Sequence, residues 1–451
     1  MNKVLNTVDI LLPTENISHE LWSVIACDQF SSQQSYWDGV MRMVGDNPST
    51  LNMIIPEAYL DNIDEDSAIT KIADVMERYI SMGIFREIKD SFIYVERELS
   101  DGNIRRGLVG AVDLEEYDFT EGANASIVAS EGTVLDRLPP RIRIREAASL
   151  ELPHIITFIA DKNNTVFKPL IEKRKTLPLL YNFKLMEDGG HLRGYQVNSE
   201  NASEIITALS NLALINKSSE QSVCASVTSQ PNPNKPGGSC KHGDSRLPAT
   251  GIMVMGDGNH SLAAAKTYWE KIKLSLSCND SLNHPARYAL VEVNNIYDPS
   301  IKFDAIHRVI FDVDVDNLIN TLSAHIESGD KGDGRDNYVL QILSSAGRKS
   351  IKMSTGSAYD IISIVQSFLD DYKSNDGGRI DYIHDEKVVE NLTKEFNCVG
   401  ILLPIVNKKD FFDSVTTKGI FPRKSFSVGH AADKRYYMEC RKIKHFNEKT
   451  D

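Results

Sequence analysis

The sequence lacks the long apolar runs and paired cysteines that would assign it quickly to a class of protein. No apolar stretch approaches the roughly 20 residues that a membrane-spanning helix needs. The six cysteines are scattered, and no two of them are separated by only two residues, which argues against a zinc ribbon or a thioredoxin-type motif. We therefore expect free thiols in a reducing compartment.

Basic residues are also too few for a typical nucleic-acid binder. The chain has 50 Lys and Arg against 63 Asp and Glu, which gives a net charge of −13 at pH 7. A protein that grips phosphate backbones needs a basic surface. The first 20 residues contain Asp9, Glu15 and Glu20 and no long apolar core, so we expect no secretory signal. These features predict a cytoplasmic protein with neither a nucleic-acid partner nor a membrane partner.

Several well-known catalytic motifs are missing as well. The sequence has no His-Glu-x-x-His helix, no pair of histidines at helix-face spacing and no Gly-x-Ser-x-Gly elbow. It has no Walker loop, and its one Gly-x-Gly turn is not a complete dinucleotide fingerprint. We therefore predict no structural metal.

What is present is an ordinary globular composition over 451 residues, 41% hydrophobic and 25% charged. Strand-like and helical patterns alternate throughout, which predicts an α/β or mixed α+β fold with a large mixed sheet. We expect an N-terminal α/β lobe over residues 1–125, a central motif-bearing core over 126–310 and a C-terminal α/β lobe over 311–451 that packs onto the core. Within the core, residues 216–247 are rich in Ser, Pro, Asn, Gly and Lys and are expected to form a disordered insertion or surface loop.

Local patterns predict particular elements. Apolar residues at helical intervals predict an amphipathic helix over 67–82, and two β-rich runs around Ser-Asp-Gly-Asn predict a hairpin. The segments 22–30 and 49–60 are expected to be short buried strands. The alternation of arginines from 141 to 145 predicts a strand with three guanidinium groups on one face.

The strongest chemical signal is Gly-Asp-Gly-Asn-His-Ser at 256–261, between an apolar run and an Ala-rich helical run. The glycines permit a tight turn, and a helix that starts there presents N–H groups and the positive end of its dipole to an anion such as phosphate. Asp257 and His260 are candidate catalytic residues, the first for a cation or a substrate hydroxyl and the second for proton transfer. The alternative is an ordinary capped helix. The candidate phosphate-binding residues of this stretch are Gly258, Asn259 and Ser261.

Other polar clusters stand near the ends of predicted elements. Glu131 is a candidate catalytic carboxylate beside the arginine-rich segment, and His307 is a candidate catalytic histidine within an apolar run. A solvated surface remains the alternative for each charged run. The other candidate phosphate- or substrate-binding residues are Asp28, Arg137, Arg141, Arg143, Arg308, His384, Arg423, Lys424, Ser425, Lys434 and Arg435.

In their order along the chain, these stretches resemble the domain-of-unknown-function family 1015 from about Asn6 to Ile443, apart from the insertion. In much of that family the central motif reads Ala-Asp-Gly-His-His-Arg. Here Asp257 and His260 match the motif, whereas Ser261 replaces its arginine. Three further family elements match at Glu131 and Thr133, at His307 and Arg308, and at Pro422, Lys424 and Ser425.

The central motif is also similar to that of the ParB/sulfiredoxin-like fold, which includes nucleotide-binding switches, sulfiredoxins and a free-serine kinase. This similarity implies a ParB/sulfiredoxin-like core around the strand, the Gly-Asp-Gly-Asn-His turn and the helix. It also implies phosphate or nucleotide handling.

Residues and resemblance together predict a small-molecule phosphoryl-transfer enzyme, in its most concrete form a nucleotide-dependent kinase of a small hydroxyl metabolite such as serine. ATP or ADP with Mg²⁺ is the expected cofactor, and a small phosphorylated or hydroxylated metabolite is the expected partner. Two alternatives stay open: a non-catalytic regulatory protein that binds a nucleotide or phosphometabolite, and a phosphatase of a phosphorylated small metabolite. The sequence also leaves open whether the chain forms a homo-oligomer.

Overall fold

The computed structural model describes residues 4–31, 33–221, 252–329, 338–355, 357–395 and 397–444. The chain divides into two compact units. Unit 1 comprises Met1–Val128, Arg137–Asp298 and Arg435–Asp451, and unit 2 comprises Ala129–Asp136 and Pro299–Lys434. These bounds differ from the expected three-part division, because the N-terminal lobe and most of the central core share unit 1.

Unit 1 is built on a mixed sheet with eleven strands in the described part of the chain. The strands are β1 (Leu5–Asn6), β2 (Val8–Pro13), β3 (Phe85–Glu98), β4 (Ile104–Asp113), β5 (Tyr117–Asp118), β6 (Ile127–Val128), β8 (Ile156–Ile159), β9 (Leu179–Lys184), β10 (His191–Val197), β11 (Met253–Asp257) and β12 (Tyr288–Asn295). The main path runs β5-β6-β11-β8-β12-β4-β3-β10-β9, with β1 beside β4 and β2 beside β3. The pairs β5–β6, β6–β11 and β8–β12 are parallel, whereas β3 and β4 form the expected antiparallel hairpin. The predicted mixed α/β fold is therefore confirmed.

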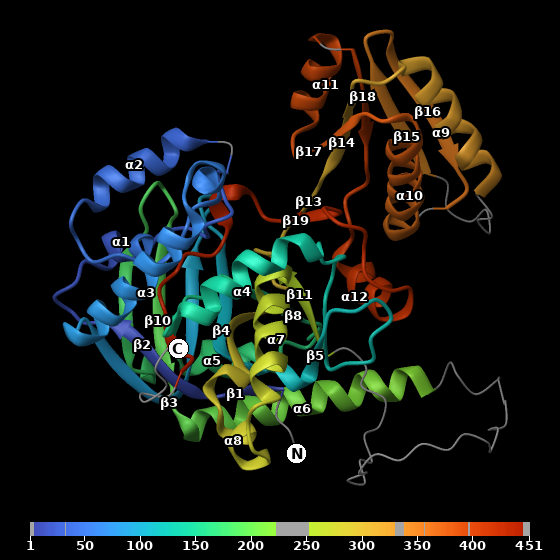
Figure 1. Cartoon of the computed structure of the whole chain (residues 1–451). Coiled ribbons are helices and arrows are strands. Elements are labelled where there is room, and N and C mark those ends of the chain that lie inside the picture. Colours follow the sequence, from blue (N-terminus) through green and yellow to red (C-terminus); the bar gives the residue numbers. More distant parts are fainter. Residues whose placement is uncertain are drawn as a thin grey trace. The chain divides into compact units, whose positions relative to one another are not determined.

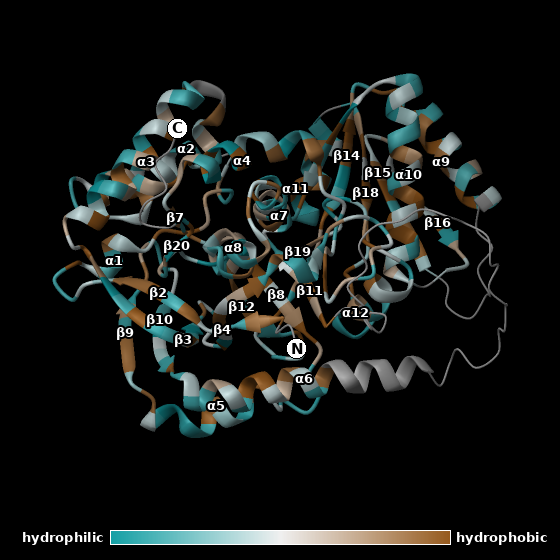
Figure 2. Cartoon of the chain, turned by 60° about the horizontal axis from the view of Figure 1, so that its bottom comes forward, coloured by the Kyte–Doolittle hydropathy of each residue, from teal (hydrophilic) through white to brown (hydrophobic). Residues whose placement is uncertain are grey.

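Helices cover both faces of this sheet. Successive residues of a strand point to opposite faces, so neighbouring residues of β3 pack into different cores. Ile93 of β3 packs in one hydrophobic core with α2 (Gln34–Val44) and α3 (Glu65–Ser81). Tyr94 packs in a second core with α5 (Phe167–Lys173), α6 (Ser199–Gln221) and α7 (Asn259–Lys273). Figure 1 shows these elements, and Figure 2 shows β8 and β11 largely in the brown of hydrophobic residues.

The arginine-rich segment forms a helix, so the expected strand is wrong. Helix α4 spans Leu138–Ala147 and has prolines in its first turn, where the missing amide hydrogen costs little. It packs on α7, where the small side chains of Ala263 and Ala264 allow Leu138 to approach closely. Arg141 and Arg145, four residues apart on this helix, therefore share a face, and Arg143 between them points away from that face.

Two other expected strands are also wrong. Segment 22–30 begins with the last residue of α1 (His19–Trp22) and contributes a single bridge, from Ile25 to Tyr436. Segment 49–60 contains the 3-10 helices η1 (Thr50–Met53) and η2 (Glu57–Asn62). Both segments are apolar because they pack into the first core, and an apolar run of this length does not distinguish a strand from other buried backbone.

The expected helix over 67–82 is confirmed by α3. The start of the expected insertion is corrected, because α6 continues to Gln221; residues 222–247 lie outside the described residues. Among the helices of the described residues, none is both long and apolar enough to cross a bilayer. Unit 1 also contains α8 (Cys278–Asn283).

Unit 2 contains a five-stranded sheet in the order β16-β15-β18-β14-β17, antiparallel at every pair, and a separate pair β13–β19. The strands are β13 (Phe303–Ala305), β14 (His307–Phe311), β15 (Tyr338–Ser344), β16 (Gly347–Met353), β17 (Arg379–Ile383), β18 (Cys398–Leu402) and β19 (Phe426–Val428). The helices are α9 (Val315–Gly329), α10 (Ala358–Asp376), α11 (Glu386–Glu395) and α12 (Lys408–Thr417). Val309 and Cys398 pack against Val389 of α11 in the core of this unit.

The last described residues of the chain return to unit 1. Cys440 pairs with Leu11, and β20 (Arg441–Lys442) pairs with β7 (Leu150–Glu151). Tyr437 is buried in the first core together with residues of β2 and α3. The core of unit 1 therefore joins the two ends of the described sequence.

Candidate functional site

The Gly-Asp-Gly-Asn-His stretch has the predicted strand, turn and helix. Strand β11 ends at Asp257, Gly258 adopts a left-handed conformation with φ +81°, and α7 begins at Asn259. The left-handed conformation favours glycine, and a Cβ atom at position 258 would make a tight contact of 3.1 Å with the Cα of Ile155. The Oδ1 of Asp257 accepts the N–H of Gly258 at 2.8 Å, which holds the turn.

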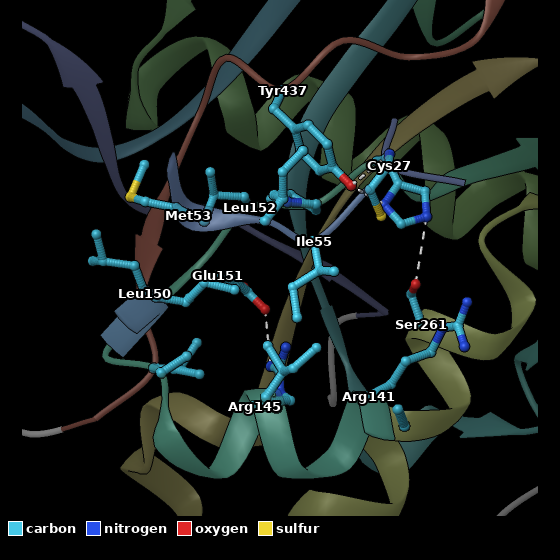
Figure 3. A pocket seen from close by; sticks show the side chains of 18 of the residues that line it. Cys27, Met53, Ile55, Arg141, Arg145, Leu150, Glu151, Leu152, Ser261 and Tyr437 are labelled. Atoms are coloured by element: carbon cyan, nitrogen blue, oxygen red, sulfur yellow. Dashed lines mark hydrogen bonds and ion pairs between the residues drawn. The ribbon is translucent and has the colours of Figure 1, made fainter. Parts of the chain in front are cut away.

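The first turn of α7 borders a cavity of about 170 Å³ within unit 1 (Figure 3). Most of its wall is apolar and comes from η1, α3, α4 and the segment 150–155. Besides one cysteine, Cys27, the polar residues that line it are Arg141, Arg145, Glu151, His154, Ser261 and Tyr437. Arg141 and Ser261 are thus the candidate residues predicted above that the structure brings to one cavity.

His154 links two hydroxyl groups of this cavity. Its Nδ1 lies 3.0 Å from the hydroxyl oxygen of Tyr437, and its Nε2 lies 3.4 Å from the Oγ of Ser261. The Tyr437 oxygen also accepts the backbone N–H of Cys27 at 3.2 Å. The imidazole therefore has a partner on each nitrogen, and one of these partners is a serine hydroxyl at the cavity wall.

The helical form of the arginine-rich segment sorts its guanidinium groups. Arg141 and Arg145 line the cavity; Figure 3 draws both on α4. Arg143 instead pairs with Glu65 at 2.9 Å and with Asp66. The expectation of three arginines on one face is therefore corrected to two, Arg141 and Arg145. Arg141 pairs with Glu57 at 2.5 Å and keeps a quarter of its side chain exposed.

The Arg145 side of the cavity is closed by an ion-pair cluster. Glu151 lies 2.8 Å from Arg145 and 2.6 Å from Arg441, and it also accepts the N–H of Leu290. Burial raises the pKa of the Glu151 carboxyl, but Arg441, Arg145 and this N–H outweigh burial and hold the pKa below its usual value. Each guanidinium group of the cavity lining therefore has a carboxylate partner, Glu57 for Arg141 and Glu151 for Arg145, and Arg141 is the more exposed of the two.

In unit 2, Glu131 is held by a loop of its own unit. Its carboxylate accepts backbone N–H groups from Lys424 at 3.2 Å, Ser425 at 2.8 Å and Phe426 at 3.3 Å. Lys424 adopts a left-handed conformation with φ +56°, which turns successive N–H groups toward one acceptor. Burial raises the pKa of the Glu131 carboxyl despite these bonds. Glu131 therefore anchors the loop that carries the predicted Lys424 and Ser425.

Arg308 is fully buried in unit 2 and is held mainly by neutral acceptors. It donates from Nε to Gln366 at 2.9 Å and from Nη1 to the carbonyl of Ile306 at 2.8 Å, and its guanidinium lies 4.6 Å from the ring centre of Tyr382. Burial lowers the pKa of Arg308 to about 10. Gln366 donates in turn to Asp370, which is the ion-pair partner of Arg423.

The two candidate histidines of unit 2 differ in exposure, because His307 is buried and His384 is exposed. Leu403 donates its N–H to the Nδ1 of His307 at 3.1 Å. Burial lowers the pKa of His307, with Arg308 acting in the same direction, and burial lowers the pKa of His384, with Lys434 and Lys424 acting in the same direction. Lys434 is itself buried, whereas Lys424 is exposed.

The remaining candidates of unit 1 stand apart from the cavity lining. Arg435 is buried and pairs with Glu292 at 2.8 Å and Glu439 at 2.7 Å, so its charge is already neutralised. Asp28 accepts from its neighbour Gln29. Arg137 is exposed, and Asp257, Gly258, Asn259 and His260 are half-buried; none of these five residues is among those that line the cavity.

Sequence reasoning did not single out His154, Tyr437 or Cys27. His154 follows a proline at the start of a buried strand, and Tyr437 lies 283 positions later in an apolar run. Neither has a local motif, because their partnership arises only when the end of the chain packs into unit 1. Within the described residues, no group of three or more His, Cys, Asp or Glu is placed to hold a metal ion.

Fold and cavity together define a mixed α/β protein with a small, largely apolar and partly basic cavity. The chain belongs to the family described as "Protein of unknown function (DUF1015)", whose model matches residues 11–403. No curated protein matches the chain.

Solved structures with some similarity include three proteins of low sequence identity. SbnI with C-terminal truncation from Staphylococcus aureus is 12% identical, with 71% of this chain and 82% of that chain covered and a TM-score of 0.34. A conserved hypothetical protein from Pyrococcus furiosus is 17% identical, with coverages of 44% and 78% and a TM-score of 0.27. A free serine kinase in complex with ADP is 14% identical, with coverages of 44% and 75% and a TM-score of 0.28. The activity of this chain is therefore inferred from its own site.

Proposed function

We propose that this protein is an enzyme that handles the phosphoryl group of a small metabolite in the cavity of unit 1. The observation that carries the proposal is the joint position of Ser261, His154 and Arg141 on the wall of one cavity. A hydroxyl, an imidazole and a guanidinium supply what phosphoryl transfer needs, which is positioning, proton transfer and charge neutralisation.

The first turn of α7 favours a phosphate at this place. The helix has 15 residues, and its positive end points toward the residues that precede Asn259. The N–H of Gly258 is already bonded to Asp257, and Ile155 packs beside Gly258, so a phosphate would approach the helix start from the side of Ser261, which lines the cavity. Arg141 adds a guanidinium, which matches the geometry of phosphate oxygens.

In its most concrete form the proposal is a nucleotide-dependent kinase of a small hydroxyl compound such as serine, with ATP or ADP and Mg²⁺. The roles predicted for Asp257 and His260, which do not line the cavity, stay predictions: Asp257 for orienting the hydroxyl or the Mg²⁺ and His260 for moving a proton. The cavity, at about 170 Å³, is smaller than the roughly 300–1,000 Å³ of usual ligand pockets, so the adenosine part would lie outside it. The roles expected for Glu131, His307, Arg308 and Lys424 in unit 2 stay predictions.

The test is turnover by the full-length chain. The protein is incubated with ATP or ADP, Mg²⁺ and a panel of small alcohols that includes serine, and new phosphate esters are followed by phosphorus NMR. Arg141→Met should lower kcat/KM by about 10- to 100-fold, because a charge-assisted bond to phosphate is lost. Arg143→Met, on the same helix but paired with Glu65 and Asp66, should change it little. Equal losses in both variants would contradict this site.

Two alternatives use the same cavity. A regulatory protein would bind a nucleotide or phosphometabolite without converting it, and Asp257→Ala would then change binding but no rate. A phosphatase would release inorganic phosphate from a phosphorylated metabolite without needing a nucleotide. Phosphate release measured with and without ADP separates the phosphatase from the kinase.

A further inference from the structure

Ser261 is the residue of the cavity that is best placed to react. Its Oγ lies 3.4 Å from the Nε2 of His154, whose Nδ1 faces the Tyr437 oxygen at 3.0 Å. When Nδ1 carries the proton and donates it to Tyr437, the lone pair of Nε2 faces the serine hydroxyl and can accept its proton. A nucleophile, a base and a third group that orients the base are thus arranged in series.

Cys27 is the other nucleophile on the cavity wall, but its surroundings disfavour reaction. Burial, with Asp28 adding to it, raises the pKa of the Cys27 thiol to about 12, so the thiolate is scarce at neutral pH. Both nitrogens of His154 have hydroxyl partners, so the imidazole is not positioned to activate the sulfur. The serine is therefore the preferred nucleophile.

We propose that Ser261 receives the phosphoryl group covalently, with His154 as its general base, in a step that rests on the proposed function. The Oγ–P bond forms while the bond from phosphorus to the leaving oxygen breaks, and the serine proton passes through Nε2 of His154 to that oxygen. Water or an acceptor alcohol then attacks the phosphoserine and gives a proton to His154, and the Ser261 oxygen recovers its proton as it leaves. The atoms balance with no further reactant.

The phosphorylated state is compatible with the position of Ser261 in the fold. It is the third residue of α7, and a phosphate in the first turn of a helix is favoured by the N–H groups and the dipole. Arg141 lines the same cavity and supplies a cation.

The cavity wall also indicates the class of donor. Apolar side chains dominate it, among them Met53, Ile55, Ile72, Met76, Leu150 and Leu152. A dry cavity of about 150 Å³ holds a benzene ring in another protein, so this cavity has room for one ring or a short branched chain. In the form of the proposed function that needs no nucleotide, the donor is therefore a phosphomonoester of a small apolar alcohol or phenol.

p-Nitrophenyl phosphate, which combines a ring with a phosphate, is the probe. On rapid mixing with the full-length protein, we expect a burst of p-nitrophenolate equal in amount to the protein. Mass spectrometry of the acid-quenched sample should locate one added phosphoryl group on the peptide that contains Ser261. Ser261→Ala should abolish both signals, whereas Ser275→Ala, just beyond α7, should abolish neither. Circular dichroism checks that both variants fold.

The outcomes separate this inference from the function on which it rests. Turnover without a burst or an adduct, at a rate that Ser261→Ala leaves unchanged, would overturn the covalent step while the phosphoryl-transfer function stands. An adduct on another residue would also overturn it. Failure of the protein to act on or bind the probe and every other phosphate compound would overturn both.

Discussion

In unit 1, His154 and Ser261 face a cavity, whereas in unit 2 Arg308 and Glu131 are enclosed by partners of their own unit. Both sets contain the residue types that catalysis uses. The difference lies in their hydrogen bonds: the bonds of Arg308 and Glu131 end on backbone groups and Gln366, while the chain through His154 ends on a hydroxyl at an open wall. A cluster of reactive residue types thus indicates a site only when one of its members still faces free volume.

The largest expected effect tests whether activity belongs to unit 1. His154→Gln should lower the kcat of phosphoryl transfer by about 10²- to 10⁴-fold, the usual contribution of a general base. His325→Gln, in α9 of unit 2, should leave kcat unchanged. Steady-state kinetics with p-nitrophenyl phosphate gives both values. A smaller loss of kcat in His154→Gln than in His325→Gln would contradict the assignment of activity to unit 1.

The next effect tests whether the enclosed residues of unit 2 stabilise it. Arg308→Met leaves the Gln366 side chain and the Ile306 carbonyl without their partner, and we expect a loss of about 2–4 kcal/mol in the free energy of unfolding of unit 2. Hydrogen exchange in β14 and α10 measures it. Arg348→Met removes only exposed ion pairs and should cost at most about 1 kcal/mol.

The corresponding change in unit 1 is Gly258→Ala, which forces a non-glycine residue into a left-handed turn close to Ile155. We expect a loss of about 1–3 kcal/mol. Trp22, Trp37 and Trp269 are all buried in unit 1, so tryptophan fluorescence during urea unfolding reports on this unit. Gly39→Ala in α2, with nothing within 4 Å of the new Cβ, should instead gain about 0.5–1 kcal/mol. Equal changes in the free energy of unfolding of Gly258→Ala and Gly39→Ala would show that the left-handed turn at Gly258 has no particular need for glycine.

The smallest effect is a pH dependence of unit 2. The pKa values of His307 and His384 are lowered in the folded state, so the unfolded chain binds more protons as the pH falls. Unit 2 should therefore be fully stabilised above about pH 6.5, the ordinary histidine value, and lose stability as the pH falls through the folded pKa values. Hydrogen exchange at pH 7.5 and 5.5 should show the loss, and His384→Gln should reduce it. Glu131, whose pKa is raised, changes the stability with pH in the opposite direction. Its contribution is the same in His384→Gln and in the unchanged protein, so it cancels when the two are compared. If His384→Gln loses as much stability between pH 7.5 and 5.5 as the unchanged protein, the predicted role of His384 is wrong.

Much of the fold follows from local patterns in the sequence. The β3–β4 hairpin, α3 and the β11–α7 junction were predictable because each carries its own period, turn residues or glycines. Helix α4 was misread because alternating arginines suggest a strand, although the prolines of its first turn are typical of a helix start.

The candidate site was predictable only in part. Ser261 was predictable from the Gly-Asp-Gly-Asn-His stretch before it, and Arg141 from the arginine-rich segment that contains it; both line one cavity. His154 and Tyr437 could not be found in this way, because a hydrogen bond between residues 283 positions apart leaves no pattern in either neighbourhood. The enclosure of Arg308 was equally hidden, since it depends on Gln366 in a distant helix.

The return of the chain end to unit 1 has a consequence for synthesis on the ribosome. Tyr437 and Cys440 fill part of the same core as Leu11 and Trp22, which are translated more than 400 residues earlier. At the usual rate of about 5–20 residues per second, Leu11 and Trp22 wait for the synthesis of more than 400 further residues before this core can be completed. The residues of unit 2 are synthesised before that moment, so unit 2 can fold while the core of unit 1 is still incomplete.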